Sequence, residues 1–128
     1  MPRPSQGCVC ASRENFRNAG RVLVAERQGE VTGFATILTR APRSDPDDAW
    51  PEHTQLAELA VLPEHRGAGI GTALIVAAEA LAREGGAPVL RVAVVADNAG
   101  ARRLYARHGF GEVQVLMQKT LKKKEDGE

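Results

Sequence analysis

Apolar and polar residues alternate along the first half of the chain, which is the pattern of strands with one buried face. Residues 21–26 and 31–39 are rich in apolar and β-branched side chains, and a turn at residues 28–30 joins them into a predicted hairpin. Residues 56–61 are predicted as a third strand, which ends at Pro63 because proline cannot donate to a strand ladder. Strands therefore dominate this half of the chain.

The second half of the chain changes to the spacing of amphipathic helices. A first helix is predicted to follow residues 66–71 and to end at the glycine pair 85–86. A second helix is predicted between a cap at Asp97 or Asn98 and the glycine at position 109. The faces expected to be buried are Ile70, Leu74, Ala77, Ala78 and Leu81 in the first helix, and Ala101, Leu104, Tyr105 and His108 in the second.

Strands are predicted again between and after the helices. Residues 89–95 form a β-branched run typical of a buried strand, and residues 110–115 and 117–121 are predicted as two final strands. The strand–helix–strand unit in the middle implies a parallel pair with a right-handed crossover, and the hairpins on either side imply antiparallel flanks. We therefore expect an α/β domain of the α+β type, with a mixed, mostly antiparallel sheet and helices packed against it.

The 128 residues fit a single domain, residues 1–128. Residues 1–20 are poorly defined by pattern, with at most one short helix at residues 11–19. Residues 40–51 contain three prolines and three aspartates and are predicted to form an acidic loop. Its Trp50 is expected to pack that loop onto the core, and the alternative is an aromatic that faces a substrate. Residues 122–128 form a charged tail.

Composition excludes several classes of function. The net charge of +1, from 17 Lys+Arg and 16 Asp+Glu, lacks the basic excess that nucleic-acid or anionic-membrane binding needs. No apolar run is long enough to span a membrane, and the first residues lack the apolar core of a secretory signal. Cys8 and Cys10 are too few for a structural zinc site. We expect a cytoplasmic protein without a metal.

The most informative local feature is the glycine-rich segment 66–71, between the third strand and the first helix. Unpaired N–H groups and the helix dipole favour an anion at a helix N-terminus, and glycines let the backbone approach it. Arg66 adds a positive charge suited to a diphosphate. A Walker loop would need a lysine before Thr72, and the spacing of a dinucleotide fingerprint is also absent.

Residues 59–74, LAVLPEHRGAGIGTAL, contain a predicted strand and Val-x-Pro before Arg-x-x-Gly-x-Gly at a predicted helix start. Residues 98–110, NAGARRLYARHGF, follow the pattern Asn-x-x-Ala-x-x-Leu-Tyr-x-x-x-Gly-Phe. Together these two segments resemble the signatures of the GNAT superfamily of acetyl-CoA-dependent N-acetyltransferases, and residues 117–121 resemble the last strand of that family. The resemblance covers residues 21–121.

This resemblance implies a central parallel pair, residues 56–61 and 89–95, that splays apart around the pantetheine arm of acetyl-CoA. It implies transfer of acetyl to a primary amine by direct attack on the thioester. The alternative is a non-catalytic acyl-CoA-binding module that serves as a sensor or an oligomerisation domain. The implied cofactor-binding residues are Leu59, Ala60 and Val61 for the pantetheine and acetyl groups, Arg66, Gly67, Ala68, Gly69, Ile70 and Gly71 for the diphosphate, and Asn98 and Tyr105 from the other side.

Two residues are candidates for the proton transfers of this chemistry. Tyr105 matches the family's general-acid position, although its place on an apolar helix face also suits core packing. Glu58 is the candidate base, because strand alternation would put it with Leu56 and Ala60 on one mostly buried face. A structural, ion-paired carboxylate is the competing interpretation of Glu58. Glu52 and His53 are weaker alternatives for the base.

The chain departs from the family at its N-terminus, because residues 1–20 cannot hold the strand and two helices that wall the acceptor site in relatives. Either the acceptor site is open, or the second subunit of a homodimer closes it, or the chain starts late relative to its relatives. The acidic loop 40–51 favours a cationic acceptor. The pattern does not distinguish among small-molecule amines, peptide termini and lysines.

Overall fold

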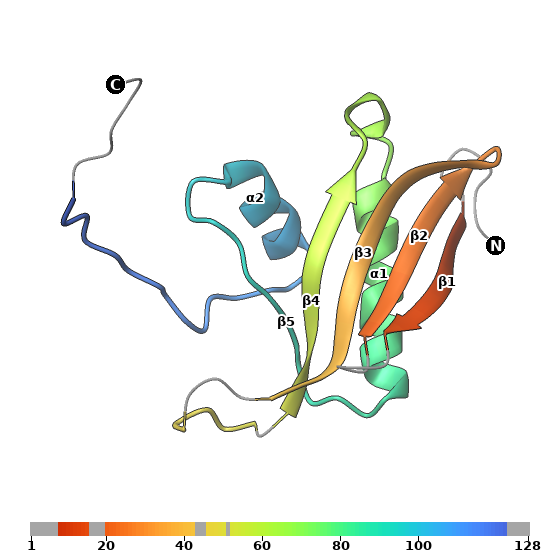
Figure 1. Cartoon of the computed structure of the whole chain (residues 1–128). Coiled ribbons are helices and arrows are strands. Elements are labelled where there is room, and N and C mark those ends of the chain that lie inside the picture. Colours follow the sequence, from red (N-terminus) through yellow and green to blue (C-terminus); the bar gives the residue numbers. More distant parts are fainter. Residues whose placement is uncertain (1–7, 16–19, 43–45, 51, 123–128) are drawn as a thin grey trace.

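The computed structural model describes residues 8–15, 20–42, 46–50 and 52–122, with side chains described from Gly20 onward. Within these ranges five strands form one sheet in the order β1-β2-β3-β4-β5, accompanied by two α-helices (Figure 1). The strands are β1 (Cys8–Asn15), β2 (Gly20–Arg27), β3 (Glu30–Pro42), β4 (Glu52–Val61) and β5 (Leu90–Val92); the helices are α1 (Ile70–Glu84) and α2 (Ala99–Arg107), and a short 3-10 helix spans Pro63–His65.

The sheet has the predicted mixed character. Strands β1 to β4 pair antiparallel with their neighbours in chain order, whereas β4 and β5 pair in parallel. Helix α1 connects this parallel pair, so β4, α1 and β5 are the strand–helix–strand unit that the sequence indicated. The prediction of a mostly antiparallel sheet with one parallel pair is confirmed.

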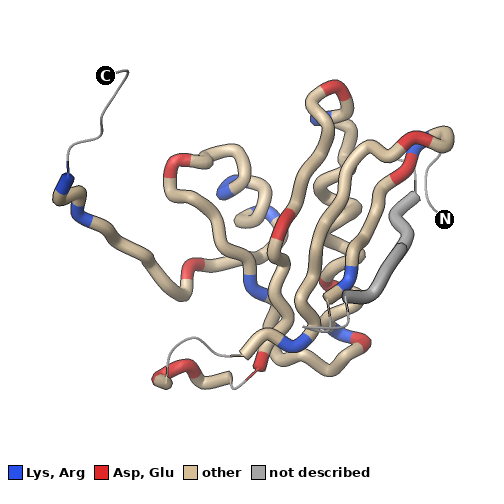
Figure 2. The backbone as a smooth tube through the Cα atoms, viewed as in Figure 1, with Lys and Arg blue, Asp and Glu red and all other residues tan. Residues whose placement is uncertain are grey.

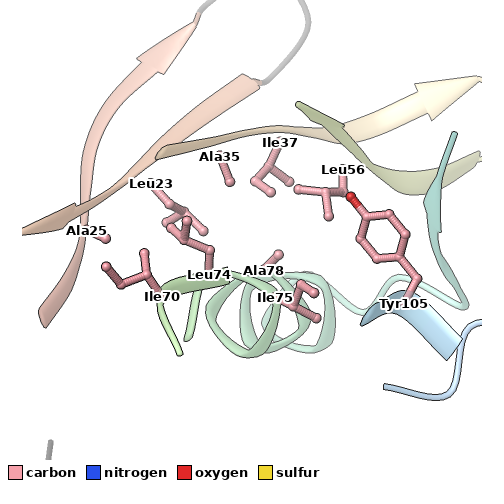
Figure 3. Packing of buried hydrophobic residues seen from close by; sticks show 10 residues of the cluster. All are labelled: Leu23, Ala25, Ala35, Ile37, Leu56, Ile70, Leu74, Ile75, Ala78 and Tyr105. Atoms are coloured by element: carbon pink, nitrogen blue, oxygen red, sulfur yellow. The ribbon is translucent and has the colours of Figure 1, made fainter. Parts of the chain in front are cut away.

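The hydrophobic core lies between α1 and one face of the sheet (Figure 3). Helix α1 contacts β1, β2, β3 and β4, and Tyr105 is the one residue of α2 that is buried in this cluster. The core is aliphatic apart from this tyrosine, as the low aromatic content requires. Its buried members are Leu23, Ala25, Ala35, Ile37 and Leu56 from the sheet, Ile70, Leu74, Ile75 and Ala78 from α1, and Tyr105.

Both helices bury the faces that their spacing predicts. In α1, Ile70, Leu74 and Ala78 are buried while Ala77 and Leu81 pack partly against the core. In the shorter α2, Tyr105 is buried and Ala101, Leu104 and His108 are half-buried. The 3.6-residue period of apolar positions therefore suffices to orient both helices.

The first residues form a strand rather than a helix. Residues 11–15, predicted to begin a short helix, belong to β1, which pairs antiparallel with β2; residues 16–19 lie outside the described residues. Pairing with the neighbouring strand overrides the weak helical pattern of this segment, as sheet contacts often do. Only the four residues 16–19 separate β1 from β2 in the sequence.

The two final strands predicted at residues 110–115 and 117–121 are absent. The described chain from Phe110 to Lys122 contains no strand and leaves the sheet as an extended segment (Figure 1). A physical reason is visible in the sequence, because one residue, Leu116, separates the two predicted strands. A hairpin needs at least two residues in its turn, and glycine or asparagine is preferred there.

The bounds of β3 and β5 and the position of Trp50 also differ from the prediction. Strand β3 continues to Pro42 and pairs there with Glu52, so the predicted acidic loop 40–51 begins later. Strand β5 is limited to Leu90–Val92 instead of residues 89–95. Trp50 is exposed and lies outside the core cluster, so the prediction that it packs the loop onto the core is wrong.

The face of the sheet opposite α1 carries no helix within the described residues (Figure 1). Phe34 of β3 is exposed, consistent with a position on this open face. In the described part of the chain, neither helix has the length and apolarity needed to cross a bilayer. The same residues contain no cluster of three or more histidine, cysteine, aspartate or glutamate side chains that could hold a metal ion.

Candidate functional site

The parallel strands part halfway along β4. Pairing between β4 and β5 runs from Thr54–Leu90 to Leu56–Val92 and then stops, although β4 continues as a strand to Val61 (Figure 1). Beyond Leu56, the edge of β4 that faced β5 has no strand beside it in the described residues. This open edge provides backbone hydrogen-bonding groups at the place where the family resemblance implied a splayed pair.

Strand register identifies which backbone groups face the open edge. The N–H of Leu62, just after β4, donates to the C=O of Thr32 in β3 at 2.9 Å. Because successive residues of an antiparallel strand point their backbone groups to alternate sides, Ala60 also faces β3 while Leu59 and Val61 face the open edge. The position of Arg66 agrees, since its Nε donates to the C=O of Val61 at 3.2 Å.

The glycine segment forms an uncapped helix start. Gly67 and Gly69 have φ of +82° and +86°, a conformation that favours glycine. Gly69 is the N-cap of α1 and supplies no side-chain cap, and the first helical hydrogen bond runs from the N–H of Ala73 to the C=O of Gly69 at 3.0 Å. The N–H groups of residues 70–72 precede that bond, and the first turn contains no acidic residue. This arrangement is suited to an anion.

Arg66 links the glycine-rich segment to the end of β4. Its backbone N–H donates to the C=O of Pro63 at 3.3 Å, so the N–H groups available to a ligand begin at Gly67. Its side chain is exposed and, through Nε, holds the carbonyl of Val61. The guanidinium group therefore lies at the junction between the helix start and the open strand edge.

Helix α2 packs against this helix start. A Cβ atom built on Gly71 would lie 3.4 Å from Cδ2 of Leu104. Asn98 caps α2, and its Oδ1 accepts from the N–H of Ala101 at 3.0 Å. The prediction that Asp97 or Asn98 caps this helix is thus resolved in favour of Asn98. A contact between Asn98 and a cofactor stays a prediction.

Tyr105 reaches the point where the two strands part. Its ring is buried, packs edge-on against Phe110 with centroids 5.5 Å apart, and points its hydroxyl toward Leu56 (Figure 3). Leu56 is the last residue of β4 that pairs with β5. Burial raises the pKa of the Tyr105 phenol above its ordinary value of 10.0, because the charged phenolate would lose solvation. The hydroxyl is therefore protonated at neutral pH.

Glu58 does not share a face with Leu56, contrary to the expectation from alternation. The register between β3 and β4 shifts between Thr36 and Ile37, which leaves Ala57 unpaired and reverses the alternation beyond it. Leu56 is buried under α1, whereas Glu58 is exposed and accepts a hydrogen bond from Thr36 Oγ1 at 3.2 Å. Glu58 adjoins the open edge as the residue before Leu59.

The two weaker candidates for the base lie at the start of β4. Glu52 is exposed. His53 is buried, and its Nε2 lies 2.8 Å from Oε1 of Gln55, while its Nδ1 has no hydrogen-bond partner among the described residues. Both are separated from the open edge by the paired part of β4, which makes them less suited than Glu58 to act there.

Sequence reasoning missed an ion pair beside the parallel strands. Nη2 of Arg91 donates to Oδ1 of Asp48 at 2.8 Å, and Nη1 of the same guanidinium donates to Oδ2. Figure 2 shows the acidic and basic positions along the backbone. These bonds, with the N–H of Trp50 donating to Oδ1 at 3.1 Å, hold the pKa of Asp48 far below its usual value. The only feature of the sequence that indicated this ion pair was Arg91, a charged residue within the β-branched run 89–95. The pair fastens the loop 46–50 to β5.

The fold and the site define an α/β domain in which a mixed sheet opens beside a glycine-lined helix start, the architecture of GNAT acetyltransferases. The chain belongs to the acetyltransferase (GNAT) family, whose model matches residues 3–110. This finding confirms the resemblance seen in the sequence and the fold that it implied.

Similar proteins support the same assignment. The chain is 35% identical over 105 residues to a mycothiol acetyltransferase of Sanguibacter keddieii, covering 82% of this chain and 32% of that protein. It is 40% identical over 100 residues to a mycothiol acetyltransferase of Nocardia farcinica, covering 78% of this chain and 29% of that protein. The chain therefore spans about a third of the length of these relatives.

The fold also matches a solved structure of an aminoglycoside N-acetyltransferase in complex with CoA. The TM-score is 0.69 at 21% sequence identity, and the match covers 81% of this chain and 77% of that one. At this identity the likeness shows the shared fold alone.

Proposed function

We propose that the chain transfers an acetyl group from acetyl-CoA to a primary amine. One observation carries the proposal: the uncapped helix start and the open edge of β4 adjoin each other, and Tyr105 points to the place where that edge begins. The names of the relatives, mycothiol acetyltransferases, support acetyl transfer, and the CoA in the solved neighbour supports the donor.

Residues of the helix start fit the diphosphate of coenzyme A. The backbone N–H groups of Gly67, Ala68, Gly69, Ile70 and Gly71 would hold it, with the Arg66 guanidinium beside them. The backbone groups of Leu59 and Val61 would hydrogen-bond the amide of pantetheine and the carbonyl of the acetyl group. Strand register turns the backbone groups of Ala60 toward β3 instead. Asn98 and Tyr105 would contact the cofactor from α2. No metal takes part in this proposal.

The acetyl-CoA molecule supplies a thioester, and the chain supplies the groups that stabilise its aminolysis. Backbone N–H groups on the open edge of β4 stabilise the negative charge that develops on the carbonyl oxygen during amine attack. The Tyr105 hydroxyl donates a hydrogen bond to the departing sulfur. Because its pKa is above 10 and that of a thiol is about 8.5, complete proton transfer from Tyr105 is uphill, and the hydroxyl acts chiefly as a hydrogen-bond donor.

Glu58 is the proposed general base. An alkylamine has a pKa of about 10.4 and is mostly protonated at neutral pH, so it must lose a proton before it attacks. Glu58 is exposed and directly precedes Leu59 on the open edge, where an incoming amine would meet it. Thr36 positions its carboxylate through the 3.2 Å hydrogen bond.

We also propose the setting in which the chain works. A small-molecule or peptide amine fits as acceptor better than nucleic acid or a membrane, because the net charge is only +1. We propose that the protein is cytoplasmic and acts as a homodimer. Two thiols only one residue apart support the cytoplasm, because they are unsuited to a stabilising disulfide.

One observation favours a second function, an acyl-CoA-binding module without turnover. The sheet face that carries Glu58 has no covering helix in the described residues, so the acceptor would be bound from few directions. Such a module would retain the helix start and the open edge, and it would bind coenzyme A as a sensor or as part of an assembly. The two functions differ in whether an amine is consumed.

The deciding experiment incubates the purified chain with acetyl-CoA and a panel of primary amines. Released coenzyme A is followed with a thiol reagent, and acetyl-CoA binding is measured separately by calorimetry. Acetyl transfer predicts thiol release that depends on both enzyme and amine. Binding without amine-dependent thiol release supports the module, and failure to bind acetyl-CoA rejects both functions.

A further inference from the structure

The side chain of Arg91 lies on the sheet face that carries Glu58. Leu90 and Val92, its two neighbours in β5, pack partly against the core, so Arg91 between them points to the opposite face. Leu59 of β4 also packs against the core, and Glu58 directly before it is exposed. Figure 1 shows the sheet from this face, with α1 behind it. Arg91 therefore shares a face with the proposed general base.

The register of the parallel strands gives the separation of Arg91 from Glu58. Arg91 is paired with Gln55, and Glu58 lies three residues farther along β4, beyond the point where the two strands part. At about 3.3 Å per residue, the positions of Gln55 and Glu58 are roughly 10 Å apart along the strand. An acceptor whose amine meets Glu58 can therefore place its other end beside Arg91.

Arg91 is the group in these two strands that is suited to a carboxylate. Strands β4 and β5 contain no lysine and no second arginine. A guanidinium group binds a carboxylate through two parallel hydrogen bonds. Gln55, the polar neighbour of Arg91, has its Oε1 2.8 Å from Nε2 of the buried His53. An acceptor that carried a carboxylate at its far end would therefore be bound through Arg91.

The chain itself places a carboxylate on this guanidinium. Both oxygens of Asp48 accept from Arg91, one from each Nη atom, which is the geometry in which arginine binds a carboxylate ligand. The side chains of Asp48 and Arg91 are only 9% and 24% exposed, so solvent screens the pair little. The N–H of Trp50 donates a further hydrogen bond to Asp48. Asp48 therefore neutralises Arg91 and takes the position that a ligand carboxylate would need.

We propose that Asp48 and Arg91 determine which amines the chain acetylates, because Asp48 masks a carboxylate receptor beside the acceptor. With Arg91 neutralised, an amine that carries a carboxylate meets the negative charge of Glu58 and no free cation of β4 or β5. The chain therefore selects amines without an acidic group. Removal of Asp48 frees the guanidinium to bind a carboxylate. The selection of acceptors rests on the proposed acetyl transfer, whereas the masking of Arg91 does not.

Two acceptors that differ only in a terminal carboxylate test the proposal with the full chain. Hexylamine and 6-aminohexanoate have the same six-carbon chain, and thiol release gives kcat/KM for each. The wild type should prefer hexylamine. Asp48→Ala should raise the ratio of kcat/KM for 6-aminohexanoate to that for hexylamine about tenfold, the gain expected from hydrogen bonds to a charged group. Because the ratio compares two acceptors of one variant, a general loss of activity does not change it.

Two further variants test whether the gain comes from Arg91. Asp47→Ala removes the same charge from the adjacent residue and should leave the ratio at the wild-type value. Asp48→Ala combined with Arg91→Met should lose the gain, because methionine cannot bind a carboxylate. Asp48→Asn replaces Asp48→Ala if circular dichroism shows that the latter is unfolded, and the same rise is expected. An unchanged ratio in the Asp48 variants, an equal rise in Asp47→Ala, or a rise that persists without Arg91 overturns the proposal.

A binding measurement distinguishes failure of this proposal from failure of acetyl transfer. In the presence of coenzyme A, calorimetry should show that 6-aminohexanoate binds Asp48→Ala about tenfold more tightly than the wild type, a difference that needs no turnover. If hexylamine is acetylated but the ratio and the binding do not change, acetyl transfer stands and this proposal is overturned. If neither amine is acetylated by any variant, acetyl transfer fails, and equal binding to the two proteins then also overturns the masking of Arg91.

Discussion

The imidazole of His108, at the end of α2, lies 3.4 Å from the hydroxyl of Thr72 in the first turn of α1. Together with the approach of Leu104 to Gly71, this contact joins two segments that are 36 residues apart in the chain. The glycine-rich segment and the asparagine–tyrosine segment, which resemble the family separately in the sequence, therefore form one structural unit. Changes in α2 are expected to be felt at the helix start.

Gly69→Asp should weaken coenzyme A binding at least about tenfold without unfolding the domain. The aspartate would put a negative charge on the uncapped start of α1, where the diphosphate is proposed to lie. Aspartate and asparagine tolerate the left-handed backbone of Gly69 better than other side chains do. Gly69→Asn is the matched neutral control and should bind more tightly than Gly69→Asp in calorimetry. Equal affinities for the two variants would contradict the proposed diphosphate site.

Tyr105→Phe should lower kcat about 100-fold and leave the affinity for acetyl-CoA within about twofold of the wild type. The substitution removes only the hydroxyl that points toward Leu56, and the ring keeps its contact with Phe110. Stopped-assay measurement of thiol release at saturating amine gives kcat, and calorimetry gives the affinity. An unchanged kcat would leave Tyr105 with a packing role alone.

The same tyrosine constrains the pH profile of the wild type. Because burial raises its pKa above 10.0, the hydroxyl keeps its proton throughout the neutral range. Loss of kcat on the alkaline side should therefore not begin below about pH 10 through this group. A fall in kcat at lower pH that disappears in Tyr105→Phe would contradict this assignment.

Glu58→Gln should reduce kcat/KM for the amine about 100-fold at pH 7, because the amide cannot accept the proton of the alkylammonium. The loss should shrink as the pH rises toward the pKa of the amine, near 10.4, since more of the amine is then already neutral. Thiol release measured across this pH range checks both effects. A uniform loss at all pH values would indicate a structural role for the carboxylate.

Thr36→Ala provides the control for Glu58. It removes the hydroxyl that donates to Glu58 at 3.2 Å but keeps the carboxylate, so it should lower kcat/KM much less than Glu58→Gln does. Equal losses in the two variants would show that the hydrogen bond, and not the basicity of Glu58, supports turnover.

The order of elements from β2 to α2 was predictable because each has a clear period of apolar residues and a local stop signal, such as Pro63 or Gly109. The face of Glu58 was not predictable, because the bulge beside Ala57 depends on pairing with β3 and leaves no mark in the strand itself. The ion pair between Asp48 and Arg91 likewise depends on tertiary structure, since a loop and a strand 43 residues apart must first meet.

The candidate site shows the same division. The helix start could be predicted from the local sequence alone. Its backbone turns with positive φ at Gly67 and Gly69, a conformation that favours glycine. The register between β3 and β4 determines which backbone groups of β4 face the open edge. This register cannot be derived from the sequence of β4 alone. The segment after Phe110 was predicted as strand from its apolar residues. That pattern does not identify the neighbouring strand with which the segment would pair.

Gly33→Ala should destabilise the fold by about 1–3 kcal/mol, because the position is overpacked by any side chain. A Cβ atom there would lie 2.7 Å from the carbonyl oxygen of Ala60 and 3.2 Å from Cγ2 of Ile70, so β3 would have to move from both β4 and α1. Gly111→Ala is the control, since nothing lies within 4 Å of its Cβ position. Urea unfolding measures both free energies, and similar values for the two variants would contradict the close approach.

Asp48→Asn should lower the Tm at pH 7, and the difference from the wild type should vanish in acid. The two hydrogen bonds from Arg91, followed by that from the Trp50 N–H, hold the pKa of Asp48 far below its usual value. A carboxyl whose pKa is lower in the folded state than about 3.9 in the unfolded state stabilises the fold above that pH, and this contribution is lost as the pH falls through the folded value. Wild-type Tm should therefore fall more steeply than that of Asp48→Asn below about pH 4. Glu30→Gln changes an exposed carboxylate of the β2–β3 turn and should keep the steep fall of Tm with pH seen in the wild type. If the plots of Tm against pH for the wild type and Asp48→Asn are parallel, the ion pair does not contribute to stability in the way proposed.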